Sequence, residues 1–199
     1  MKSALKSGLL ALAAAALPAV ASAHPALGEA AGFSHGFAHP MSGLDHILAM
    51  VMVGVFAFQL GGRARWLLPA TFVLVMALGG ALGVAGISIP FVELGIALSV
   101  VVLGAVVALN VKAPLAAAIG VVGLFAIFHG HAHGTEMPEN AAGVAYAAGF
   151  MIATALLHAA GLALGYVIGR AGERQGVFVT RTAGGIAALA GVGILAGMI

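Results

Sequence analysis

The chain has 199 residues, of which 62% are hydrophobic and 7% charged, and its mean hydropathy is +1.16. Soluble domains carry roughly 25% charged residues, so this composition excludes a soluble domain. It predicts an all-α integral membrane protein. The formal net charge of +2 comes without a basic tract, so no nucleic-acid partner is expected. The chain has no cysteine, which excludes disulfides and thiolate ligands. It also lacks the Gly-Lys-Ser/Thr sequence of a phosphate-binding loop, so we expect neither ATP hydrolysis by such a loop nor an ATPase subunit.

Residues 1–23 have the layout of a secretory signal peptide. Two lysines precede a short apolar run, and Ala21-Ser22-Ala23 matches a small-residue cleavage site. We therefore expect a mature chain of residues 24–199, one transmembrane domain that begins at His24. The free amine and imidazole of His24 would then form a two-nitrogen metal chelate. An uncleaved first helix is the alternative.

Six apolar segments follow, and each is expected to cross the hydrocarbon core of about 30 Å as a helix. They are expected at about 41–60, 67–86, 91–111, 114–130, 141–169 and 183–199. Residues 24–40 are expected to form a periplasmic lead-in, with Pro40 in the first turn of the first span. Gly161, Gly165 and Gly169 repeat at intervals of four and predict a stripe of close helix packing.

The cations of the expected mature chain fall in or beside the loops after the first, third and fifth spans. They are Arg63, Arg65, Lys112, Arg170, Arg174 and Arg181. By the positive-inside rule, these loops are cytoplasmic and the mature amino terminus is periplasmic. We therefore expect a multi-pass protein of the bacterial inner membrane, whose helices contact the lipid bilayer. The histidine motifs are expected on its periplasmic face.

The first motif stands at the start of the first span and contains His39, Asp45 and His46. In a helix begun at Pro40, the seven-residue spacing places the two histidines close to one face, with Asp45 one residue off it. Ionisable groups that enter a span usually line a polar path. Asp45 is expected to bind metal directly or to accept the second N–H of a ligating histidine. A structural Asp–His hydrogen bond between helices is the alternative.

The second motif is Phe128-His129-Gly130-His131-Ala132-His133-Gly134-Thr135-Glu136. If it is helical, His129, His133 and Glu136 share one face, with His131 turned nearly opposite. All four are candidate metal ligands. Imidazole with carboxylate suits borderline divalent ions such as nickel, cobalt and zinc. The alternative is a histidine-rich loop that binds metal only incidentally.

Both motifs lie at the outer ends of their spans, so we expect folding to join them into one site. Three further residues are weaker candidates as metal ligands. Glu93, near the outer end of the third span, would add a carboxylate, and His35 lies beside the first motif. His158, deeper in the fifth span, is expected to be either a relay ligand toward the cytoplasm or a helix-packing histidine.

The segment His39-Pro40-x3-Leu44-Asp45-His46, together with the second motif, resembles the paired signature of the HupE/UreJ family of nickel and cobalt permeases. The resemblance covers nearly the whole chain. The larger nickel/cobalt transporter family has four residues between His and Asp, whereas this chain has five. The resemblance implies secondary uptake of nickel or cobalt for hydrogenase, urease or cobalamin synthesis. It also implies that the residues that recognise the metal are His39, Asp45, His46, His129, His133 and Glu136.

Two other functions fit parts of the pattern. The pairs His35/His39 and His129/His133 resemble the histidine boxes of membrane di-iron oxidases, but such boxes are expected at the cytoplasmic face. A metal receptor that binds without transport is the second alternative. We expect a transporter without enzyme activity or resident cofactor. Nickel and cobalt are both expected as substrates, because both accept this ligand set. The glycine stripe is sufficient for packing within one bundle and does not require a dimer.

Overall fold

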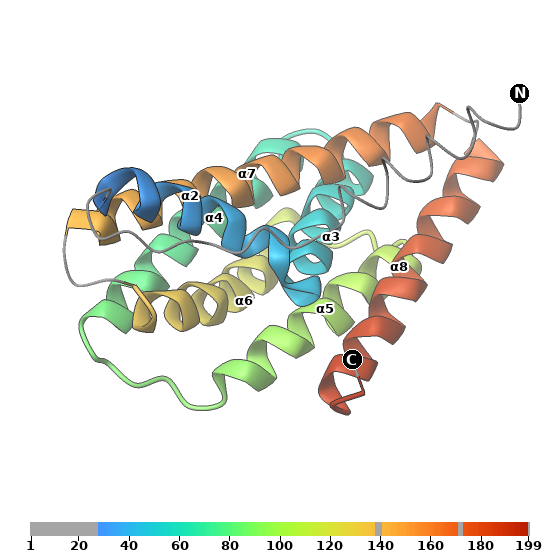
Figure 1. Cartoon of the computed structure of the whole chain (residues 1–199). Helices are drawn as coiled ribbons and strands as arrows, with labels where there is room; N and C mark the ends of the chain where they lie inside the picture. Colours follow the sequence, from blue (N-terminus) through green and yellow to red (C-terminus); the bar gives the residue numbers. More distant parts are fainter. Residues whose placement is uncertain (1–27, 138–140, 171–172, 199) are drawn as a thin grey trace, which may run out of the picture.

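A computed structural model of the chain describes residues 28–137, 141–170 and 173–198. These residues form helices without any strand, which confirms the all-α prediction for the described part (Figure 1). The signal peptide and His24 lie outside the described residues. The helices are α2 (Gly28–Ser42), α3 (Leu44–Leu60), α4 (Ala64–Val84), α5 (Val92–Ala108), α6 (Leu115–Thr135), α7 (Ala141–Gly169) and α8 (Glu173–Leu195).

Four of the described helices, α4, α6, α7 and α8, are long and apolar enough to cross a membrane. Helices α2 and α3 qualify together as a fifth span that is bent by 80°, and α5 is a shorter apolar helix. The chain is therefore built as a multi-pass membrane protein. The count of six spans stays a prediction.

Residues 28–42 form a helix, which corrects the prediction of a lead-in over residues 24–40. Pro40 lies inside the last turn of α2, not at the start of the first span. Since proline lacks the N–H that would continue the helical ladder, α2 ends two residues later. Gly43 then takes an extended conformation (φ −93°, ψ 125°) and α3 begins. His39 and His46 therefore stand on two helices, and the prediction that they share the face of one helix is wrong.

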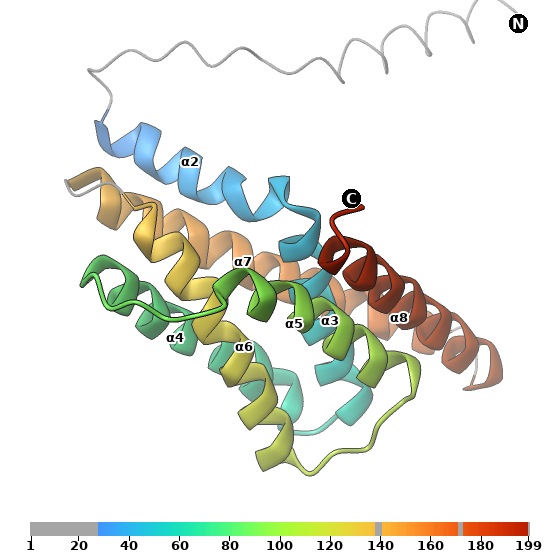
Figure 2. The ribbon, with the colours of Figure 1, turned by 90° about the horizontal axis from the view of Figure 1, so that it is seen from below.

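The helices pack in close pairs. Helix α4 lies along α6, α2 along α7 and α5 along α8, while α3 contacts α4, α5 and α7 (Figures 1 and 2). Glycine stands where backbones meet, as where Gly134 faces Gly80 and where Gly161 faces Gly54. Gly165 and Gly169 lie against the ring of Phe58, so the predicted stripe does pack closely. Small residues at such points let helices approach without a side chain between them.

The predicted cationic loops gather at one end of the bundle. Lys112 Nζ donates to the carbonyl of Gln59 at 3.0 Å, which joins the loop after α5 to the end of α3. Arg181 Nε donates to the carbonyl of Ala108 at 2.9 Å. The histidine motifs lie at the opposite end, where α2 and α6 end and α3 begins. The structure therefore separates the cations from the histidines along the helix axes.

Candidate metal-binding site

The second motif is helical as far as Thr135, where α6 ends, beyond the predicted end at residue 130, and Glu136 is the C-cap. His129 and His133 are both buried and face the interior of the bundle. His131 is also buried but points elsewhere, with Nε2 2.7 Å from the carbonyl oxygen of Ile87 in the loop after α4. The structure therefore brings His129 and His133 together and leaves His131 outside the cluster.

Asp45 and His46 form a local pair in the first turn of α3. Asp45 Oδ1 accepts the backbone N–H of His46 at 2.8 Å and lies 2.9 Å from His46 Nδ1. A carboxylate only accepts hydrogen bonds, so Nδ1 carries a proton and donates it. In a neutral ring, a proton on Nδ1 leaves Nε2 with its lone pair available. Asp45 thus orients His46 as the carboxylate partner of a metal-ligating histidine does.

His133 joins the two motifs. Its Nε2 lies 2.5 Å from His46 Nε2, and its Nδ1 lies 3.7 Å from Glu136 Oε2. When His46 Nε2 accepts, His133 Nε2 donates, and the His133 Nδ1 lone pair then faces a carboxylate. Two acceptors that face each other favour a cation between them.

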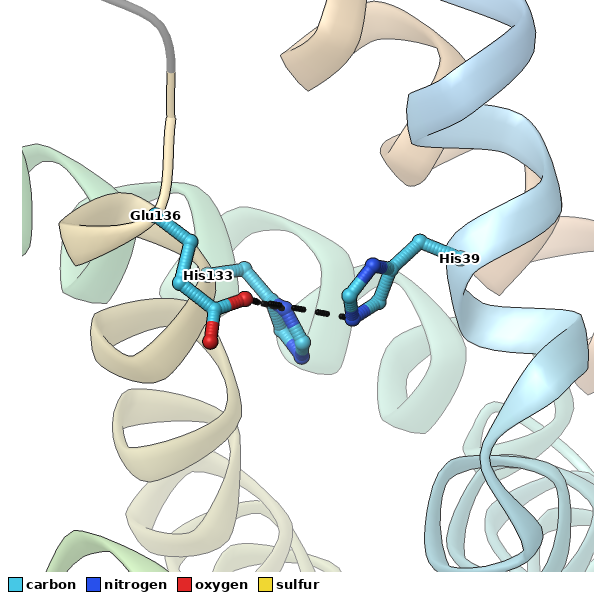
Figure 3. Close-up of side chains that lie close together, drawn as sticks. All are labelled: His39, His133 and Glu136. Atoms are coloured by element: carbon cyan, nitrogen blue, oxygen red, sulfur yellow. Dashed lines mark ion pairs between the residues drawn. The ribbon is translucent and has the colours of Figure 1, made fainter. Parts of the chain in front are cut away.

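The ligand atoms of His39, His133 and Glu136 all lie within 4.8 Å of one another (Figure 3). His39 reaches in from α2, and its Nε2 is 4.0 Å from Glu136 Oε2. The Glu136 side chain is 61% exposed, whereas that of His133 is 9% exposed. The three residues offer two imidazoles and one carboxylate at the edge of the bundle, a donor set that suits borderline divalent ions.

Four imidazoles form what we call the histidine row, namely His39, His133, His46 and His129. The ring centroids are 4.7 Å apart for His39 and His133, 4.6 Å for His133 and His46, and 4.7 Å for His46 and His129. The row leads from the partly exposed His39 to the fully buried His129. Nitrogen ligands therefore stand in contact from the edge of the bundle to its interior.

The model of one family, described as HupE / UreJ protein, matches residues 11–194 of this chain. The chain belongs to the HupE/UreJ family. It is also 51% identical over 187 residues to the "Protein HupE" of Rhizobium leguminosarum bv. viciae. This match covers 94% of this chain and 95% of that relative. No solved structure matches. HupE/UreJ proteins are a transporter family and not enzymes, and membership implies nickel or cobalt transport. The resemblance drawn from the two motifs is confirmed.

The site of this HupE/UreJ chain opens into a cavity of about 240 Å³. Its lining residues are His39, Ser42, Gly43, Asp45, His46, Glu93, Ile96, Ala132, His133 and Glu136. Glu93, in the first turn of α5, therefore shares a cavity with both motifs, as the sequence suggested. Since one water takes about 30 Å³ in the liquid, the cavity has room for an ion with several waters.

The two remaining candidate ligands, His35 and His158, lie at the two ends of the histidine row. His35 is exposed one turn before His39, and its ring meets that of Tyr146 edge-on at 5.6 Å. His158 is buried beyond the histidine row, and neither of its nitrogens has a hydrogen-bond partner in the described part of the chain. Phe72 stands between, with its ring centroid 5.5 Å from that of His129 and 5.0 Å from that of His158.

Sequence reasoning missed Phe150 as part of the site wall. Its ring centroid is 4.3 Å from that of His133, one helical turn beyond Tyr146 on α7. The four-residue spacing of these two aromatic residues was the available signal, but many buried aromatic pairs have this spacing. Only the contact between α2 and α7 shows that this face of α7 covers the histidines.

Proposed function

We propose that this HupE/UreJ protein is a secondary transporter that takes up Ni²⁺ or Co²⁺ from the periplasm into the cytoplasm. The observation that supports this most strongly is the joining of the two motifs. Residues of α2, α3 and α6, distant in sequence, place imidazole and carboxylate groups around one cavity. The histidine row then leads from that cavity into the bundle.

Capture begins where Glu136 and His39 are accessible. A hydrated ion exchanges some waters for the imidazoles and the carboxylate, and Glu93 adds negative charge at the cavity edge. Because neighbouring rings of the histidine row are in contact, the ion changes ligands in short steps and is never without nitrogen donors. His158 is the next nitrogen ligand beyond Phe72. Ligands that are exchanged one at a time keep binding weak enough for release.

The membrane potential is a sufficient source of energy for this step. A potential of about 100 mV, negative inside, is worth about 2.3 kcal/mol per charge and therefore about 4.6 kcal/mol for a divalent ion. That free energy supports an accumulation of roughly a thousandfold. No ATPase subunit and no resident cofactor are part of this proposal.

The proposed orientation places the histidine end in the periplasm, and cysteine labelling tests it. The chain has no cysteine, so Ser88→Cys and Arg63→Cys each introduce a single thiol at an exposed loop position. In spheroplasts, a membrane-impermeant maleimide should label Ser88→Cys, at the histidine end. Arg63→Cys, at the cation end, should react only after the inner membrane is opened. The reverse pattern would contradict the orientation.

Uptake of radiolabelled nickel into vesicles that contain the purified protein tests transport itself. We expect nickel to accumulate when a potential is imposed, and cobalt to compete. His46→Ala and His129→Ala should each lower the uptake rate by about a hundredfold, since even a partner of a metal ligand contributes ten- to a hundredfold to affinity. Equilibrium binding of nickel without potential-driven uptake would contradict transport and indicate a metal receptor.

A further inference from the structure

Ser99 contacts the innermost ring of the histidine row from a neighbouring helix. It lies on α5, is fully buried, and places Oγ 2.9 Å from Nε2 of the fully buried His129. The same Oγ lies 2.5 Å from the carbonyl oxygen of Ile96, one turn earlier on α5. One hydroxyl therefore touches two groups, and it has a single proton to share between them.

The contact with Ile96 decides where that proton is. A carbonyl oxygen cannot donate, so two oxygen atoms at 2.5 Å require the hydroxyl proton between them. Ser99 Oγ is then an acceptor toward His129, and His129 Nε2 must be the N–H donor. A neutral imidazole carries one ring proton, so Nδ1 of His129 keeps its lone pair. This Nδ1 has no hydrogen-bond partner among the described residues.

We propose that Ser99 is a positioning residue that holds His129 with its proton on Nε2 and leaves Nδ1 as its only ligand atom for the transported ion. This inference rests on the proposed function, in which His129 is a ligand. Asp45 has the same role for His46 but engages the other nitrogen, Nδ1, so that Nε2 is the nitrogen that keeps its lone pair. The two neighbouring rings, 4.7 Å apart, therefore present opposite nitrogens to the ion.

The choice of nitrogen has a physical consequence. Nδ1 is bonded to the ring carbon that carries the side chain, so an ion on Nδ1 sits closer to its helix than an ion on Nε2. An ion that passes from His46 to Nδ1 of His129 is therefore held close to the backbone of α6. A His129 ring with its proton on Nδ1 would present an N–H to the ion and block that step.

Nitrogen-15 NMR of the protein in lipid bilayers tests the assignment without any transport assay. The protein is labelled at its histidines and held metal-free at pH 8, where ordinary histidines are neutral. The signals lost in His129→Gln identify His129. We expect a protonated Nε2 and a bare Nδ1 in the wild type, and a mixture of both tautomers in Ser99→Ala. A protonated Nδ1 in the wild type would overturn the proposal even if every Ser99 variant failed to fold.

Two variants separate this role from a general loss of a buried hydroxyl. Ser99→Thr keeps the hydroxyl and should restore the wild-type pattern. Thr180→Ala removes a buried hydroxyl that bonds to its own helix at Gly176 O, at 2.8 Å, in α8 away from the histidines. It should leave the His129 signals unchanged. An identical tautomer in Ser99→Ala and the wild type would overturn the proposal.

Titration with Zn²⁺, a diamagnetic substitute for nickel, tests the ligand atom. We expect Zn²⁺ to shift the Nδ1 signal of His129, with about tenfold weaker binding in Ser99→Ala. A titration that leaves Nδ1 unmoved overturns its assignment as the ligand atom. Because these measurements are made at equilibrium, their failure is distinct from failure of the proposed function, which would appear as binding at Nδ1 without nickel uptake.

Discussion

Replacement of His133 by alanine should abolish nickel uptake, with the rate lowered by a hundredfold or more. His133 is the residue through which the two motifs meet, since it contacts His46 through Nε2 and faces Glu136 through Nδ1. Its ring also packs against that of His39. Without this side chain, the outer ligands lose their connection to the buried half of the histidine row.

His131→Gln is the matched control for His133→Ala. His131 lies on the same helix and is equally buried: the whole residue is 6% exposed for His131 and 8% exposed for His133. Glutamine retains an amide that can still bond to the carbonyl of Ile87, so the loop after α4 keeps its anchor. We expect near wild-type uptake for His131→Gln in the same vesicles. Equal losses in the two variants would show that His133 acts through the structure of α6 and not as a ligand.

Replacement of Gly130 by alanine should both destabilise the protein and stop uptake. A Cβ at this position would run into the backbone of Met76 and Gly80 on α4, which cannot move as a flexible side chain can. The two helices must separate, and overpacking of this kind costs about 1–3 kcal/mol of unfolding free energy. Because α6 also carries His129 and His133, the displacement moves two ligands away from His46.

Gly120→Ala provides the control for Gly130→Ala on the same helix. A Cβ at Gly120 meets nothing within 4 Å, and alanine favours a helix interior over glycine, so we expect unchanged packing and uptake and a thermal midpoint no lower than that of the wild type. The measurements are thermal unfolding of the purified protein in detergent and nickel uptake in vesicles. A Gly130→Ala protein with the wild-type midpoint and wild-type uptake would show that α4 and α6 do not need this close approach.

The sequence by itself determined the class of protein and the chemistry of the second motif. Runs of apolar residues are sufficient to predict membrane helices, because the hydrocarbon core sets their length. The spacing of His129 and His133 is sufficient to place both on one face of α6, because helix geometry is local. The separation of cations from histidines follows from the order of the segments. Family membership was visible in the same two motifs.

Only the tertiary structure decided how the first motif joins the second. Helix α2 forms against α7, where Gly36 and Gly149 allow close backbone contact, and this contact is invisible in the periodicity of residues 24–40. The turn at Gly43 then places His39 and His46 on different helices, and both rings contact that of His133. The hydrogen bond between His129 and Ser99 likewise links residues thirty positions apart. Contacts between distant segments depend on how whole helices pack, and local patterns of residues do not specify that packing.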